Sequence, residues 1–288
     1  AYSNLGNTLH ELGRLDKAET SCRQAIALKP DFATAHSNLG NTLKRLGRLD
    51  EAEASYNQAI ALQPDFAEGH SNLGNTLQEL GRLDEAEASY NQAIALKPDY
   101  AEAHYNLGNT LQELGRLDEA EASYSQAIAL KPDLAEAHSN LGVTLKELSR
   151  LDEAEASYTQ AIALKPDYAE AHSNLGITLH ELGRLEEAEA SLRQAIALKL
   201  DFAGAHSNLG DTLKELGRLN EAEACYKRAI ALNADYAETH SNLGVTLKEL
   251  GRFEEAEASL RQAIALKPDY AEAYSNLGIT LHELGRLD

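Results

Sequence analysis

A unit of 34 residues repeats along the whole chain without interruption, and this period constrains the fold more than any other feature. Each copy runs close to Ala-His-Ser-Asn-Leu-Gly-Asn-Thr-Leu at its start and to Ala-Ile-Ala-Leu-Lys-Pro-Asp-Tyr-Ala-Glu at its end. Eight full copies cover residues 1–272, and a half copy covers residues 273–288. A fixed period of this length indicates one supersecondary unit stacked on itself, and it favours a helix–turn–helix unit.

The copy at residues 69–102 begins with the pattern of an amphipathic helix. Leu73, Leu77 and Leu80 stand at i, i+4 and i+7, which places them on one side of a helix. Gly81 follows directly and is expected to end this first helix. We expect both helices of the unit to have about 14 residues, or roughly 21 Å of length.

The second helix of this copy is expected to begin at a capping box formed by Asp84 and Glu87, because a helix dipole favours acidic side chains in the first turn. Pro98 ends the helix, since proline cannot continue it. Asp99 is expected to cap the first helix of the next copy. One such helix pair cannot bury its own apolar side, so neighbouring pairs must stack.

Gly74 stands inside the first helix, and a glycine recurs at this place in every copy. Glycine in a helix costs roughly 1 kcal/mol relative to alanine. A recurring cost needs a recurring compensation, and the simplest is a close approach of the paired helix. The small residues Ala86 and Ala93 are expected to face the glycine.

The pattern resembles the tetratricopeptide repeat (TPR), whose signature is matched by Leu73-Gly74, Ala86, Tyr90, Ala93 and Pro98. The resemblance covers the whole chain. It implies an all-α fold, a right-handed superhelix of antiparallel helix pairs, with first helices lining the concave wall and second helices the convex wall. It also implies a single array over residues 1–288, in which residues 273–288 form a ninth first helix.

Some positions depart from the family pattern. His70 replaces the usual bulky aromatic residue, Leu200 and Ala234 replace the proline, and Ser149 replaces the turn glycine. These substitutions are expected to loosen local caps without changing the fold. The array also begins inside a first helix and stops where a second helix should begin, so we expect it to be a piece of a longer array.

An asparagine stands at the same place of the first helix in all nine units. These residues, called the Asn row below, are Asn4, Asn38, Asn72, Asn106, Asn140, Asn174, Asn208, Asn242 and Asn276. An amide side chain can both donate and accept hydrogen bonds, so it can pair with the backbone of a peptide of any sequence. The row is similar to one in the TPR arm of O-linked N-acetylglucosamine transferases, where it engages peptide backbones. The alternative is that each amide bonds a neighbouring repeat and stabilises the stack.

A second row, called the groove row, lies beside the Asn row and changes in character along the chain. Its members are Asn41, Asn75, Asn109, Val143, Ile177, Asp211 and Val245. The N-terminal half of the groove is therefore predicted to be more polar than the C-terminal half. A bound segment is expected to place apolar side chains against Val143, Ile177 and Val245, so replacing Val143 and Ile177 by Asn should weaken binding.

Histidine recurs at the spacing of the repeat, with one imidazole in each unit and no second ligand close by. These residues are His36, His70, His104, His138, His172, His206 and His240. This spacing does not provide a metal site. Packing between repeats and a pH-sensing row are the two interpretations. His10, His180 and His282 fall on the polar side of the first helix and are expected to be exposed.

Charge and motif content exclude several classes of function. The formal net charge is −20, and so acidic a surface repels phosphate backbones and disfavours nucleic-acid binding. No apolar run is long enough to insert into a membrane. Catalytic residues, metal ligands and cofactor motifs are not expected, because the carboxylates recur in every copy and the glycines lie within helices.

The sequence therefore predicts a non-catalytic scaffold that binds extended protein or peptide segments in a concave groove. One alternative is a structural block that stacks end to end, by self-association, in a filament or surface assembly. The other is the TPR arm of a larger glycosyltransferase. The compartment in which the chain works does not follow from its sequence.

Overall fold

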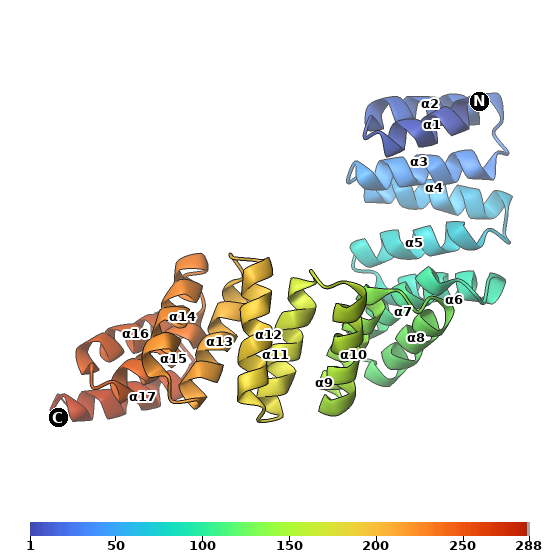
Figure 1. Cartoon of the computed structure of the whole chain (residues 1–288). Coiled ribbons are helices and arrows are strands. Elements are labelled where there is room, and N and C mark those ends of the chain that lie inside the picture. Colours follow the sequence, from blue (N-terminus) through green and yellow to red (C-terminus); the bar gives the residue numbers. More distant parts are fainter. Residues whose placement is uncertain (287–288) are drawn as a thin grey trace. The chain divides into compact units, whose positions relative to one another are not determined.

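The computed structural model describes residues 1–286, which form 17 α-helices and no strand (Figure 1). First helices, with odd numbers, have 13 residues apart from α1, and second helices, with even numbers, have 14. The all-α prediction is therefore confirmed, and the expected helix lengths agree to within one residue for every helix except α1, which has 10 residues.

The contacts between helices divide the chain into two units, Ala1–Leu148 and Ser149–Asp288. The first unit contains α1 (Tyr2–Glu11), α2 (Leu15–Leu28), α3 (Ala33–Arg45), α4 (Leu49–Leu62), α5 (Ala67–Glu79), α6 (Leu83–Leu96), α7 (Ala101–Glu113), α8 (Leu117–Leu130) and α9 (Ala135–Glu147). The second contains α10 (Leu151–Leu164), α11 (Ala169–Glu181), α12 (Leu185–Leu198), α13 (Ala203–Glu215), α14 (Leu219–Leu232), α15 (Ala237–Glu249), α16 (Phe253–Leu266) and α17 (Ala271–Glu283). The expectation of one continuous array stays a prediction.

Within each unit the helices stack in the same way. Each first helix packs against the second helix that follows it, and each second helix packs against the next first helix. The backbones of successive first helices also approach each other, as those of α5 and α7 do. Within residues 1–286 the backbones of successive second helices of one unit stay farther apart, and long side chains such as Arg23 and Glu51 join them. The first helices therefore line the more closely packed side of each stack. We call this side the first-helix face.

The core of each repeat is built around a large side chain of the second helix. Tyr90 is fully buried between two alanines of α6 that are equally buried. A Cβ atom added to Gly74 would lie 2.7 Å from a ring carbon of Tyr90. The space left by the missing side chain is thus occupied by the tyrosine ring, which the sequence did not predict. The expected close approach of the paired helix is seen at Gly176, where an added Cβ would lie 3.2 Å from the backbone oxygen of Ala188.

The helix starts differ from the expected caps. Arg82 is the N-cap of α6 and makes no side-chain cap hydrogen bond, and the same is true of Tyr100 at the start of α7. The predicted capping box of Asp84 and Glu87 and the predicted cap at Asp99 are therefore wrong. Glu87 instead accepts a hydrogen bond of 2.6 Å from Arg116 in the next repeat, so its carboxylate joins two repeats.

The turns after the first helices have a left-handed residue. Gly81 has a φ of +73°, as expected for a glycine that ends a helix. Ser149 takes the same conformation at φ +62°, and it is the only residue other than glycine with a positive φ in the part that the structure describes. A side chain in this region costs roughly 1–2 kcal/mol, so Ser149 loosens this turn without removing it.

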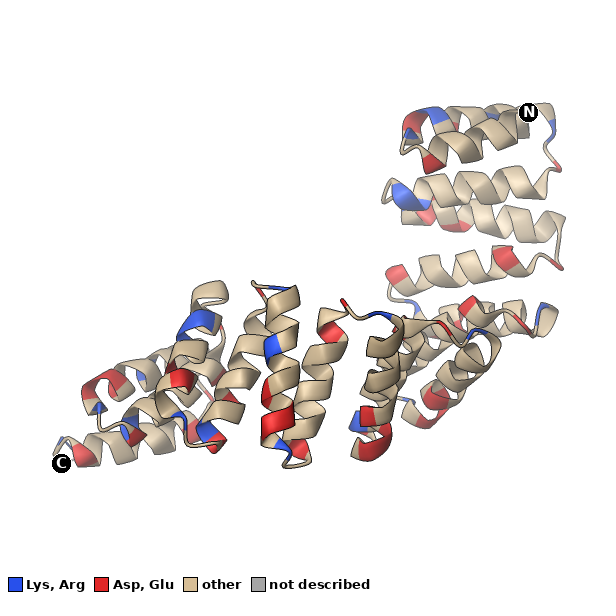
Figure 2. Ribbon diagram, in the orientation of Figure 1, with Lys and Arg blue, Asp and Glu red and all other residues tan. Residues whose placement is uncertain are grey.

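Acidic residues are spread over the helices of both units and outnumber basic ones (Figure 2). Many of them pair with arginine at the joints between repeats. Arg82 contacts Glu53 of the preceding repeat at 2.7 Å and Glu85 of its own helix at 2.6 Å. In the range 1–286, none of the helices combines the length and apolar character of a membrane span.

Candidate functional site

The Asn row lies on the first-helix face of both units. Asn4 is exposed, and the other eight members are half-buried. Four members donate a side-chain hydrogen bond to the preceding repeat: Asn38 to Ser3 at 3.1 Å, Asn106 to Asn75 at 2.9 Å, Asn140 to Asn109 at 2.9 Å, and Asn242 to Asp211 at 2.8 Å. These four residues therefore bond a neighbouring repeat, as the alternative interpretation of the Asn row expected.

Three of the other half-buried members differ in their use of the amide. The side chains of Asn72, Asn208 and Asn276 have no hydrogen bond to the described residues. The backbone carbonyl of each accepts a hydrogen bond from the hydroxyl of the threonine one turn later, and the same bond is found in the rest of the row. Their amide groups are therefore not needed to hold the stack together.

The groove row is connected to the core by the buried tyrosines. Four buried tyrosine hydroxyls donate to a groove-row oxygen: Tyr56 to Asn41 at 2.6 Å, Tyr90 to Asn75 at 2.7 Å, Tyr124 to Asn109 at 2.8 Å, and Tyr226 to Asp211 at 2.8 Å. A buried hydroxyl without a partner costs about 1–3 kcal/mol, so the polar groove residue stabilises the tyrosine in these four pairs. Tyr158 is buried too, but the groove-row residue 15 positions before it is the aliphatic Val143.

Where the core holds leucine instead, the groove residue is aliphatic. Leu192 and Leu260 replace the tyrosine in α12 and α16, and both are fully buried. The groove residues of the same helix pairs are Ile177 and Val245. The polarity of the groove row in these pairs therefore follows the second helix. Sequence reasoning missed this link, although its signal was present in six pairs of residues 15 apart; Val143 and Tyr158 do not follow it.

Several pockets open on the first-helix face of the first unit. One, of about 390 Å³, is lined by α5, α7 and α9, and includes Asn109 and Asn140. A second, of about 350 Å³, contains Asn41 between α1, α3 and α5. A third, of about 410 Å³, includes Tyr105 and Asn106. Predicted site residues of both rows are thus brought together in these hollows.

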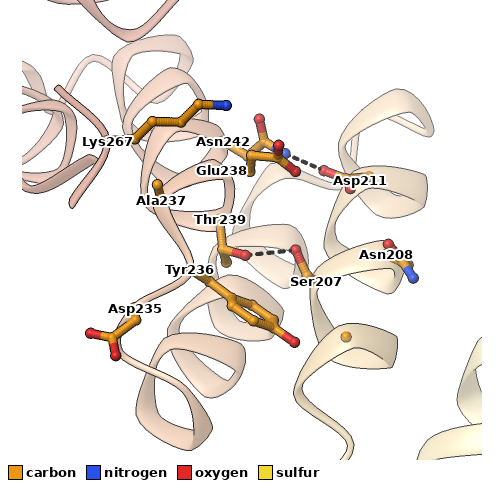
Figure 3. Close-up of a pocket in the computed structure, with 11 residues that line it drawn as sticks. Ser207, Asn208, Asp211, Asp235, Tyr236, Ala237, Glu238, Thr239, Asn242 and Lys267 are labelled. Carbon is orange, nitrogen blue, oxygen red and sulfur yellow. Dashed lines mark hydrogen bonds between the residues drawn. The ribbon is translucent and has the colours of Figure 1, made fainter. Parts of the chain in front are cut away.

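The second unit has a pocket of about 320 Å³ between α13 and α15 (Figure 3). Asn208 and Asp211 line it from α13, and Asn242 lines it from α15. Ser207 and Thr239 join the two helices through a hydroxyl hydrogen bond of 2.9 Å. Burial raises the pKa of the Asp211 carboxyl above its usual value, although the hydrogen bonds from Tyr226 and Asn242 act in the opposite direction.

The recurring histidines have a structural role. Nε2 of His104 lies 3.1 Å from the carbonyl oxygen of Pro98, and each of the seven makes the same contact six residues back. Burial lowers the pKa of His206. The prediction for the polar-side histidines is wrong in two cases, because His10 and His180 are half-buried beside acidic residues, while His282 is exposed.

Within residues 1–286, no three His, Cys, Asp or Glu side chains are grouped so that they could hold a metal ion. Cys22 is buried, and a Cβ on Gly6 would lie 2.5 Å from its sulfur, so this thiol fills the place of the tyrosine ring in the first repeat. Cys225 is half-buried. Burial raises the pKa of the Cys22 thiol to about 11.

Solved structures with the same architecture span most of the chain. The Cut9 and Hcn1 complex of the APC/C gives a TM-score of 0.69 at 16% identity, covering 93% of this chain and 52% of the other, so this chain spans about half its length. PilF of Pseudomonas aeruginosa gives 0.66 at 20% identity, covering 74% and 97% of the two chains. YrrB, described as a TPR protein with an unusual peptide-binding site, gives 0.55 at 25% identity, covering 65% and 96%.

Two family models match the sequence. The model of the cilia and flagella-associated protein 70 C-terminal domain matches residues 66–277, and the tetratricopeptide repeat model matches residues 1–65 and 31–99. No curated protein sequence matches the chain. The chain therefore belongs to the tetratricopeptide repeat family, and its repeats match the model of the cilia and flagella-associated protein 70 C-terminal domain over most of its length.

Proposed function

We propose that the chain is a non-catalytic scaffold that binds extended segments of partner proteins along the first-helix face of its repeats. TPR proteins bind protein partners, and the family generally consists of scaffolds without catalysis. The finer statement, that a peptide lies on this face and contacts the Asn row, is supported by the hydrogen bonding of the row and by the pockets beside it.

The amide oxygens of the Asn row support backbone recognition. In Asn106, Asn140 and Asn242 the side-chain nitrogen donates to the preceding repeat, and the side-chain oxygen accepts nothing from the described residues. Such an oxygen is held in place by the bond on the other side of the amide and can accept an N–H group from a peptide. This arrangement is the single observation that carries the proposal.

The pockets support the same function through side chains. A groove that engages a peptide backbone needs hollows for the side chains that alternate along an extended segment. The pockets of both units contain members of the Asn row or the groove row. YrrB, which shares the fold at 25% identity, is described as having a peptide-binding site.

The test uses members of the row that the stack does not need. Peptides are selected from a phage-displayed random library on the intact chain, and their affinities are measured by fluorescence anisotropy. Asn72→Ala and Asn208→Ala should each weaken binding of peptides that lie over their unit by about two- to tenfold, the effect of one lost hydrogen bond. Thermal stability should not fall, because alanine is the better helix former.

Asn91→Ala is the matched control, because Asn91 is an exposed asparagine on the second helix α6. It should leave peptide affinity unchanged. Affinities that are equal in all three variants would show that the first-helix face is not the binding surface. The filament and the glycosyltransferase-arm alternatives, like the exclusion of nucleic acid, stay predictions, and concentration-dependent light scattering tests the first of them.

A further inference from the structure

Asp211 is the one carboxylate in the groove row, whose other members are asparagine or aliphatic residues. It lies in the pocket between α13 and α15. Three repeats earlier the equivalent residue is Asn109, which lines the pocket of α5, α7 and α9 together with Asn140. Asp211 and Asn109 can therefore be compared as equivalent positions that differ in charge.

The same hydrogen bonds hold both side chains. Oδ1 of Asp211 accepts the Tyr226 hydroxyl and the Asn242 amide, both at 2.8 Å. Oδ1 of Asn109 accepts the equivalent groups at 2.8 Å and 2.9 Å. The difference lies in the second atom, which is a donor nitrogen in Asn109 and a second carboxylate oxygen in Asp211. That oxygen, Oδ2, receives no hydrogen bond from the described residues.

A second carboxylate of the pocket is also without a cation. Glu238 extends between α13 and α15 in Figure 3, and no ion pair joins it to another described residue. Two repeats earlier the equivalent Glu170 pairs with Lys199 at 3.2 Å. The equivalent lysine, Lys267, lines this pocket and holds its ammonium 4.9 Å from the centre of the Tyr270 ring, and it forms no ion pair with Glu238.

The rim of the pocket is open where other repeats carry a larger side chain. Gly204 stands at the position that is glutamate in most copies, and a Cβ added there would meet only Phe202, at 3.8 Å. Asp235 lies at the edge and points away from Asp211 (Figure 3). The volume of about 320 Å³ is at the lower end of the range for small-ligand sites, which suits one side chain rather than a whole ligand.

We infer that this pocket receives a lysine or arginine side chain of the bound peptide segment, with Asp211 Oδ2 and Glu238 as its acceptors. The inference rests on the proposed peptide-binding function and adds a charge preference to the second unit. A cation between two carboxylates is attracted by both of them. Hydrogen bonds in which donor and acceptor are both ionised are also stronger than hydrogen bonds between neutral groups. The Asn109 pocket offers no carboxylate at the equivalent position and is not expected to select a basic residue through it.

The test compares peptide selection on two intact proteins, the wild type and Asp211→Asn. Asparagine keeps the oxygen that accepts Tyr226 and Asn242, so the variant reproduces the bonds seen at Asn109. Peptides selected on the wild type should be enriched in lysine or arginine at one position, and this enrichment should disappear on the variant. A wild-type peptide should bind the variant about tenfold more weakly.

Two controls separate this pocket from the acidic charge of the whole chain. Asp99→Asn removes the same charge at an exposed residue of the first unit and should not change the affinity of the basic peptides. Replacing the enriched residue of the peptide by glutamine should lower affinity for the wild type, and much less for Asp211→Asn. Asn109→Asp, the reciprocal change, should create a preference for basic peptides in the first unit.

Three results would overturn the inference, and they differ from one another. Selected peptides without basic enrichment, or with equal enrichment on Asp211→Asn, would end the charge preference while peptide binding stands. Equal weakening by Asp99→Asn would show a general effect of net charge. Failure to select any binding peptide on either protein would end the proposed function, and the inference with it.

Discussion

The helix pairs α5–α6 and α11–α12 have the same fold and opposite groove chemistry. In the first pair the buried Tyr90 donates its hydroxyl to Asn75, which makes the groove polar. In the second pair the buried Leu192 has no polar group, and Ile177 takes the groove position. The comparison teaches that a surface residue can be coupled to a side chain of the core, because a buried hydroxyl gains from an acceptor. The coupling is not complete, since Val143 stands 15 residues before the buried Tyr158.

The pair α13–α14 shows a third solution. Tyr226 again donates a hydroxyl, but its acceptor is the carboxylate of Asp211. The hydrogen-bond length matches that of Tyr124 and Asn109, at 2.8 Å in both cases. Packing of the repeat therefore tolerates a change of charge at this position, so the binding preference of a repeat can change while its core does not.

The largest expected effect concerns the glycine that admits the core side chain. Gly74→Ala would place a methyl group 2.7 Å from the Tyr90 ring, and Gly176→Ala would place one 2.6 Å from Leu192. We expect each change to lower the free energy of unfolding by about 1–3 kcal/mol, measured in urea. Both kinds of helix pair should respond, because both fill the same space.

Gly278 provides the control for this prediction. A Cβ added there meets nothing within 4 Å, so Gly278→Ala should raise stability by up to about 1 kcal/mol, the difference in helix propensity. Equal stabilisation by Gly74→Ala and Gly278→Ala would show that the tyrosine ring moves aside without cost.

A second prediction converts one kind of helix pair into the other. Asn41→Val removes the acceptor of the Tyr56 hydroxyl, whose bond to Asn41 is 2.6 Å long. This should cost about 1–3 kcal/mol, because the hydroxyl is left buried without a partner. Combining it with Tyr56→Leu reproduces the pair Val245 and Leu260, and the double variant should be more stable than the sum of the single changes.

A double-mutant cycle of urea unfolding curves measures this coupling, which we expect to be about 1 kcal/mol or more. Additive losses in the cycle would show that the core residue and the groove residue of this pair are not coupled.

The smallest expected effect is on the pH dependence of stability. Burial raises the pKa of Asp211 above its usual value, while Tyr226, Asn242, Lys214 and His180 act to lower it. A carboxyl whose pKa is raised on folding destabilises the fold when both states are ionised, and the cost disappears as pH falls through the folded pKa. Asp211→Asn should therefore be more stable than the wild type at neutral pH.

This difference should shrink as the pH is lowered below the ordinary pKa of an aspartate. Thermal unfolding followed by circular dichroism at neutral and acidic pH provides the measurement. A gain from Asp211→Asn that is the same at both pH values would mean that ionisation of Asp211 is not its source.

Much of the fold followed from local pattern. The spacing of Leu73 and Leu77 and the stop at Gly81 predicted the first helix to within a residue or two, because helix periodicity involves neighbours three or four residues apart. The capping boxes failed for a physical reason. Glu87 was predicted from its spacing to Asp84, but Arg116 of the next repeat offers an ion pair that the local pattern does not contain.

The candidate site was predicted only in outline. The sequence placed both rows on the first helices, because a constant position in each repeat must lie on one face of the stack. It left two interpretations of the Asn row open. The structure shows that Asn106 and Asn140 bond the preceding repeat while Asn72 does not.

By itself, the sequence determined that the chain forms repeated helix pairs and which residues share a face, since these depend on period and on helix geometry. Only the tertiary structure decided that tyrosine hydroxyls reach the groove row, that the in-helix glycines make room for a core side chain, and that Asp211 keeps one oxygen toward a pocket. Those outcomes join residues 15, 16 or 31 positions apart. Such pairs meet only when helices pack, and no local spacing specifies which partner a buried polar atom will find.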